Sequence, residues 1–138
     1  MIAVSKCLLG ENCRYDGGHC KDEKIMAYLK DKEFVAICPE CLGGLPIPRE
    51  PSEIIDGKVY SKSLKSVDEA FHLGAEKALQ IIKEHGCRAA ILKENSPSCG
   101  IHWVYDGTFS GKKIAGKGIC TQLLEENGIR CFSSEEIE

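Results

Sequence analysis

The chain has 138 residues with a formal net charge of −3, from 18 basic and 21 acidic side chains, and 43% of its residues are hydrophobic. This length predicts one domain that buries a core without covalent crosslinks, and the interspersed charges exclude the basic face of a duplex-binding protein. No apolar run approaches the roughly 20 residues that span a bilayer, so we expect no contact with a membrane.

Apolar runs along the chain predict the strands of one sheet. The first three runs, Ile2–Ser5, Phe34–Ile37 and Ala89–Leu92, consist mainly of β-branched or small apolar residues and do not alternate strictly. Continuous runs of this kind are typical of buried parallel strands. A last strand is expected at Ile129–Phe132.

Helices are predicted between these strands, at Asp22–Lys32, Ser66–His85 and Gly118–Gly128. In the longest, Ser66 and Glu69 form a capping-box pattern and Gly86 supplies the stop. The Asp-Gly pair within Trp103–Gly111 indicates a hairpin, and Gly43–Glu53 reads as a loop rich in glycine and proline.

Together these elements predict a single α/β domain over residues 1–138. We expect a mainly parallel central sheet with helices on both faces, in a Rossmann-like arrangement, and a small hairpin insertion.

The chain carries nine cysteines. The number is odd, and the N-terminal segment lacks the charged and apolar parts of a secretory signal. We therefore expect reduced thiols and a cytoplasmic protein, in which clustered cysteines serve metal binding or catalysis.

Three cysteines follow predicted strands. Cys7 comes two residues after the first, Cys38 directly follows the second, and Cys99 ends the loop that leaves the third. Because the carboxyl ends of parallel strands share one edge, where ligand sites form, these thiols should meet there. Cys13 and Cys41 lie in the same loops, and Cys20 is undecided. Cys87, Cys120 and Cys131 are interpreted as small buried hydrophobic residues.

Three stretches carry a resemblance to a known family. They are CLLGENCRYDGG (residues 7–18), CPECLGGLPIPRE (38–50) and KENSPSCG (93–100), and GKGICTQLLEENGI near the C-terminus adds to them. In this order they resemble the prokaryotic thiouracil desulfidases, long catalogued as a domain of unknown function. The combination is specific, whereas each stretch alone is weak.

The resemblance implies a [4Fe–4S] cluster held by three cysteines, with the fourth iron open to the sulfur of a thiocarbonyl substrate. Carried onto this sequence, the ligands are Cys7, Cys38 and Cys99. Cys41 is the alternative to Cys38. This chain has a second thiol three residues after Cys38, at a position where the family commonly has an aliphatic residue. Soft thiolates suit such a cluster, and three of them leave one iron open.

An open iron can polarise a thiocarbonyl so that water attacks the carbon, and the reaction then needs a group that moves protons. Glu40 is the best-placed acid or base, or else it caps loop amides. Ser96 and Ser98 are candidates to hydrogen-bond the substrate or the cluster sulfurs, or else form a turn. Lys93 and Arg49 are candidate substrate-binding residues, with structural ion pairs as the alternative.

Two other functions remain open. Cys38 and Cys41 form a C-x-x-C motif as in thiol redox proteins, although the following LGGLPIP is not expected to continue as a helix. Cys7, Cys13, Cys38 and Cys41 would alternatively close a structural zinc site.

The expected partner is a small thiolated base or related compound. RNA is a possible carrier of such a base, but the charge does not support it. The sequence does not decide the oligomeric state.

Overall fold

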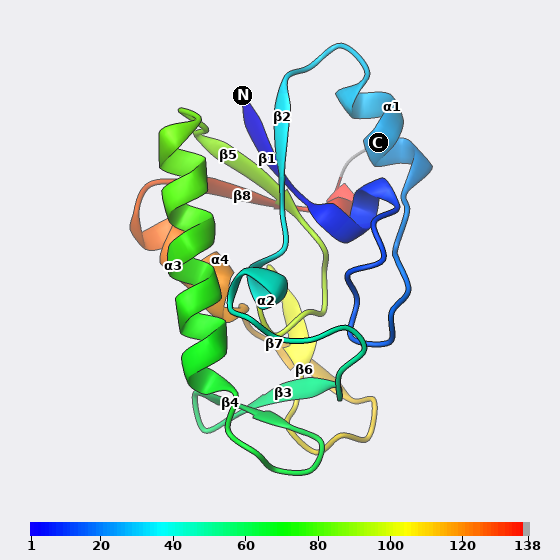
Figure 1. Ribbon diagram of the computed structural model, residues 1–138, viewed down its shortest axis with the longest axis vertical. Coiled ribbons are helices and arrows are strands. Elements are labelled where there is room, and N and C mark those ends of the chain that lie inside the picture. Colours follow the sequence, from blue (N-terminus) through cyan, green and yellow to red (C-terminus); the bar gives the residue numbers. More distant parts are fainter. Residues whose placement is uncertain (137–138) are drawn as a thin grey trace.

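The computed structural model describes residues 1–136, and its centre is a parallel sheet with the strand order β2-β1-β5-β8 (Figure 1). The strands are β1 (Ile2–Ser5), β2 (Phe34–Ile37), β5 (Ala89–Leu92) and β8 (Arg130–Ser133). The expected mixed α/β architecture is confirmed. Residues 137 and 138, the end of the predicted domain, lie outside the described part.

The register brings the ends of the four strands level. Ser5 pairs with Ile37 across β1 and β2, and Leu92 pairs with Ser133 across β5 and β8. Since every pair is parallel, all four strands end at one edge of the sheet. This edge carries the segments that hold Cys7, Cys38 and Cys99.

Helices cover both faces of the sheet (Figure 1). On one face lie α3 (Asp68–Glu84) and α4 (Ile119–Glu126), and on the other lie the short η1 (Lys6–Leu9) and α1 (Glu23–Leu29). Alternate strand residues supply the two cores, because successive side chains of a strand point to opposite faces. Ala3 packs in the core of α3 and α4, and the next residue, Val4, packs with η1 and α1. Within residues 1–136, no helix combines the length and the apolar character that a membrane crossing requires.

The start of α3 differs from the prediction. The helix begins at Asp68, and no side chain caps its first turn from Val67, so the Ser66–Glu69 capping box does not form. Instead, Asp68 Oδ1 accepts the backbone N–H of Val59 at 3.0 Å. A tertiary contact with β4 (Lys58–Ser61) therefore sets this helix end.

Two hairpins lie beyond the carboxyl edge of the sheet (Figure 1). The predicted one consists of β6 (Trp103–Tyr105) and β7 (Lys113–Ala115). The second pairs β3 (Ser52–Ile55) with β4, so the expected loop ends at Pro51 and its last two residues begin a strand. At the C-terminal end of the described chain, η2 spans Ser134–Glu136.

A short helix, α2 (Pro39–Leu42), begins directly after Cys38. The sequence analysis assigned no helix to Pro39–Leu42, whereas its expectation that LGGLPIP does not continue as a helix is confirmed, because α2 ends at Leu42 and Gly43 follows. The turn forms because α2 packs closely on α3 at two glycines. A Cβ atom at Gly74 would overlap the carbonyl oxygen of Pro39, and one at Gly43 would overlap that of Ala70.

This close approach makes Gly74→Ala a test of the fold. In an ordinary helix interior, alanine is more favourable than glycine by roughly 0.5–1 kcal/mol. Here we expect the opposite sign, a loss of about 1–3 kcal/mol, because the methyl group forces α2 away from α3. Urea unfolding measures the difference, with Glu76→Ala, at an exposed position of α3, as control. Unchanged or increased stability of Gly74→Ala would contradict the packing described here.

Candidate functional site

Three cysteines from three strand ends line one cavity. Cys7 lies in η1, Cys38 precedes the first turn of α2, and Cys99 lies in the loop after β5. All three line a cavity of about 350 Å³. The parallel register thus carries thiols that are far apart in sequence to one place, as the strand-end argument predicts.

The cavity is lined by polar and by aromatic residues. The side chains with polar or charged groups include Lys6, Arg14, Glu40, Glu53, Lys62, Lys93, Glu94 and Ser96. The aromatic residues are Tyr15, Tyr105 and Phe109, the last two from β6 and the loop that follows it. A volume of this size lies at the low end of the range for small-molecule sites, about 300–1,000 Å³.

The structure separates Cys38 from Cys41. Cys38 lines the cavity and Cys41 does not. Both thiols lie near the carbonyl oxygen of Cys13, with S···O distances of 4.0 Å for Cys38 and 3.9 Å for Cys41. Cys13, which is 6% exposed, and Cys20 also line the cavity.

The thiols at this edge hold their protons strongly. Hydrogen bonding with Cys13, followed by burial, raises the pKa of the Cys38 thiol well above its usual range. Burial, together with the neighbouring Cys38, raises the pKa of Cys41 to about 11. Both thiols are therefore protonated in the metal-free protein, and a metal site would hold them as thiolates.

The loop that carries Cys99 is held by its own serine and by α4. Ser96 Oγ accepts the backbone N–H groups of Ser98 and Cys99 at 3.0 and 3.1 Å. The N–H groups of Ile119 and Cys120, in the first turn of α4, donate to the carbonyls of Pro97 and Ser98. A side chain at Gly118 would overlap the Ser98 carbonyl, so this approach requires glycine. Burial, opposed by Ser5, raises the pKa of the Cys99 thiol to about 12.

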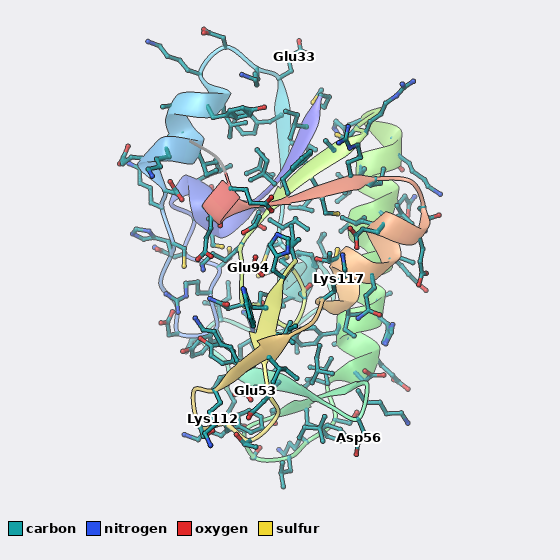
Figure 2. The ribbon with its side chains drawn as sticks, turned by 180° about the vertical axis from the view of Figure 1, so that it is seen from behind. Glu33, Glu53, Asp56, Glu94, Lys112 and Lys117 are labelled. Atoms are coloured by element: carbon teal, nitrogen blue, oxygen red, sulfur yellow. The ribbon has the colours of Figure 1, made fainter. Side chains whose placement is uncertain are left out.

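Glu94 anchors the far end of the same loop, and the sequence analysis did not find it. Its side chain is 2% exposed and lies in the middle of the molecule (Figure 2). Oε1 accepts the backbone N–H groups of Ile101, His102 and Trp103 at 2.7, 3.0 and 3.1 Å. Burial opposes ionisation of Glu94, but these hydrogen bonds outweigh it and lower the pKa of the carboxyl group.

Glu40 and Arg49 form a pair at the cavity wall. Glu40 lines the cavity, and its Oε2 lies 3.3 Å from Nη2 of Arg49, whose side chain is 6% exposed. The guanidinium also donates to the carbonyls of Cys13 and Pro46, each at 3.0 Å. Arg49 does not line the cavity, which fits the ion-pair alternative left open for it. Burial raises the pKa of Glu40 despite the opposing charge of Arg49.

The remaining predicted site residues divide into two kinds. Lys93 and Ser96 line the cavity, and Lys93 Nζ donates to the carbonyl of Glu94 at 3.2 Å. Ser98 is 1% exposed and lies outside the cavity lining, and its hydroxyl has no hydrogen-bond partner among residues 1–136. Cys87 and Cys120 belong to the core and Cys131 packs against it, as their interpretation as buried hydrophobic residues predicts.

A single metal ion does not fit the side-chain geometry. Across residues 1–136, no group of three His, Cys, Asp or Glu side chains converges closely enough to hold one ion. A zinc ion draws its sulfur ligands to about 2.3 Å from one point, whereas a four-iron cluster spreads them over separate irons. The soft thiols of Cys7, Cys38 and Cys99 around one cavity fit the second kind of group better.

Comparison with known proteins decides the family. The sequence profile of the 2-thiouracil desulfurase family matches residues 2–136. The chain belongs to this family. A curated relative, the uncharacterized protein YbbK of Bacillus subtilis (strain 168), is 47% identical over 147 residues, which cover 99% of this chain and 97% of YbbK.

A solved structure of the family agrees in fold. The [4Fe–4S]-dependent thiouracil desulfidase TudS superimposes with a TM-score of 0.93 at 42% identity, covering 99% of this chain and 91% of TudS. The resemblance found in the three cysteine-bearing stretches is therefore confirmed at the level of family and fold.

The anchoring role of Glu94 predicts a pH-dependent stability difference. A lowered folded-state pKa stabilises the protein above the unfolded-state pKa, and this contribution is lost as the pH falls through the folded-state value. Glu94→Gln should therefore lower the free energy of unfolding by about 1.5–3 kcal/mol at neutral pH, because charge-assisted hydrogen bonds are lost. The gap should shrink below about pH 4.

Urea unfolding of the metal-free protein at several pH values measures this gap. The control is Glu33→Gln, which alters an exposed carboxylate far from Glu94 (Figure 2). A gap that stays constant down to acidic pH would contradict the role given to the Glu94 carboxylate.

Proposed function

We propose that this protein removes sulfur from a thiocarbonyl compound such as 2-thiouracil, with no net redox change, and releases sulfide and the oxo product. The observation that carries the proposal is the convergence of Cys7, Cys38 and Cys99 on one cavity. Support comes from the family, and from TudS, a [4Fe–4S]-dependent thiouracil desulfidase with the same fold. We propose that the functional unit spans residues 1–138.

The cofactor in this proposal is a [4Fe–4S] cluster held by the Sγ atoms of Cys7, Cys38 and Cys99. When bound, it supplies an iron without a protein ligand, which acts as a Lewis acid toward the substrate sulfur. Cys38 is preferred to Cys41 as the middle ligand because Cys38 lines the cavity. The hydroxyl of Ser98, buried beside Cys99, is proposed to hydrogen-bond sulfur.

Glu40 is the proposed proton-moving group. Glu40 lines the cavity and burial raises the pKa of its carboxyl group, so it can take a proton from water and return it to the product. Arg49 Nη2 donates to Oε2 of Glu40 at 3.3 Å and so fixes the orientation of the carboxyl group. In this arrangement Arg49 acts through Glu40, and direct contact with the substrate is the alternative role.

Lys93 and Ser96 are proposed to orient the substrate ring. Lys93 lines the cavity, and its ammonium group, which donates to the carbonyl of Glu94, has further hydrogens to donate to a ring carbonyl. Ser96 Oγ accepts two backbone N–H groups, which leaves its own hydrogen for a ligand acceptor. These polar groups would hold the thiocarbonyl toward the three cysteines.

A serine series tests the ligand set. Cys7→Ser, Cys38→Ser and Cys99→Ser should each lose most of the broad brown absorbance and of the about four irons per chain gained on anaerobic reconstitution. Cys41→Ser, Cys87→Ser and Cys131→Ser should keep both, because these thiols do not line the cavity. Iron and sulfide analysis measures the outcome. Loss of iron in Cys41→Ser with retention in Cys38→Ser would reverse the assignment, and stoichiometric zinc without iron uptake would refute the cluster.

Glu40→Gln separates proton transfer from cluster binding. Glutamine keeps the size of the side chain but cannot act as a base, so sulfide release should fall about 10²- to 10⁴-fold. The cluster spectrum should stay, and substrate should still perturb it, because sulfur binding does not require the carboxylate. Glu33→Gln, at an exposed position, serves as the control. Near-normal turnover of Glu40→Gln would show that Glu40 only supports the loop.

A further inference from the structure

The loop between β6 and β7 reaches the same cavity as the three cysteines. Phe109, in this loop, lines the cavity together with Cys7, Cys38 and Cys99. The loop lies outside the stretches that carry the family resemblance. Phe109 therefore brings an apolar aromatic side chain to the cavity from a separate part of the chain.

The backbone of Phe109 adopts a conformation that is unfavourable for its side chain. Its φ angle is +56°, in the left-handed region that glycine and asparagine tolerate better than bulky residues. Such a conformation persists only where the surroundings fix it, and it is found preferentially at ligand sites. A phenylalanine at this position calls for a reason other than turn formation.

A buried carboxylate from β3 fixes this conformation. Glu53 is 7% exposed and lies beside the β6–β7 hairpin (Figure 2). Its Oε1 accepts the backbone N–H groups of Gly107 at 2.9 Å and Phe109 at 3.2 Å. A buried carboxylate is costly unless it is hydrogen-bonded, so the placement of Glu53 against these two amides ties the loop to β3.

The rest of the loop is closed on itself. The backbone N–H of Asp106 donates to the carbonyl of Lys112 at 2.9 Å, and Asp106 Oδ1 accepts the backbone N–H of Thr108 at 3.0 Å. These bonds fix the residues on either side of Phe109. Phe109, which lines the cavity, is thus held by contacts that leave its backbone little freedom.

We infer that Phe109 is the surface on which the ring of the substrate base stacks, and that Glu53 is the positioning residue that holds Phe109 there. The inference rests on the proposed function, because it takes a thiolated pyrimidine as the ligand. A flat heteroaromatic ring stacks on an aromatic side chain without regard to its exact substituents. Phe109 would hold the ring, while the polar side chains that line the cavity hydrogen-bond to its edge.

Steady-state kinetics of Phe109 variants with 2-thiouracil test the inference. In the cluster-loaded protein, Phe109→Ala and Phe109→Leu should raise KM by about 5- to 150-fold with little change in kcat or iron content, because stacking is lost. Phe109→Trp should restore a low KM. Leucine keeps an apolar side chain of similar size, so its defect would not reflect a misfolded loop. Phe34→Ala, a half-exposed phenylalanine outside the cavity lining, is the matched control.

The role of Glu53 is tested in the same assay. Glu53→Ala should raise KM in the same direction, and the double variant with Phe109→Ala should be no worse than Phe109→Ala alone, because Glu53 acts through Phe109. Additive effects would assign Glu53 a contact of its own with the substrate and overturn its positioning role.

Binding of uracil, the sulfur-free ring, to the cluster-loaded protein separates this inference from the proposed function. Weaker calorimetric binding of uracil to Phe109→Ala than to the wild type supports stacking, even if the wild type releases no sulfide. Normal turnover with an unchanged KM in Phe109→Ala and Phe109→Leu overturns the inference and leaves the proposed function standing. A wild type that neither binds uracil nor releases sulfide overturns both.

Discussion

The parallel register of the central sheet is the constraint on which the site depends. Ser5 and Ile37 end level with each other, as do Leu92 and Ser133, so the segments after β1, β2 and β5 leave from one edge. A shift of one strand along its neighbour would move one cysteine by about 3.3 Å per residue and turn its core residues to the wrong face. The two hydrophobic cores, one on each face, therefore also fix the spacing of the thiols.

Contacts outside the sheet then hold two of the thiols, Cys38 and Cys99, in place. Cys38 depends on the glycine contact between α2 and α3, and Cys99 depends on Ser96, on the first turn of α4 and on Glu94. Two buried glutamates hold loops at this edge of the sheet in a similar way. Glu94 accepts backbone N–H groups that follow Cys99, and Glu53 accepts the backbone N–H of Phe109. Both tie an irregular loop to the fold through backbone N–H groups that donate to Oε1, which offsets part of the cost of burying each carboxylate, while Oε2 of Glu94 has no hydrogen-bond partner among residues 1–136.

The sequence predicts the strands of the sheet and the positions of the cysteines better than the side-chain contacts that hold the loops. The strands at Ile2–Ser5, Phe34–Ile37 and Ala89–Leu92 carry local apolar patterns, so their positions and the cysteines after them follow directly. Glu53 bonds amides 54 and 56 positions away, a relation that no local pattern contains. The missed hairpin of β3 and β4 turns at Asp56–Gly57, a usable signal, but the proline-rich stretch before it favoured a loop. The capping box at Ser66 does not form. The helix begins at Asp68, and Oδ1 of Asp68 accepts the backbone N–H of Val59 in β4.

We propose that this cavity exchanges sulfur for oxygen on a thiolated ring without consuming electrons. The most direct test measures the amounts of sulfide and uracil released when anaerobically reconstituted protein acts on 2-thiouracil with no reductant present. Our account predicts equimolar sulfide and uracil over many turnovers, by protein that contains about four irons per chain. Turnover that requires a stoichiometric reductant, or iron-loaded protein that leaves 2-thiouracil intact, would contradict it.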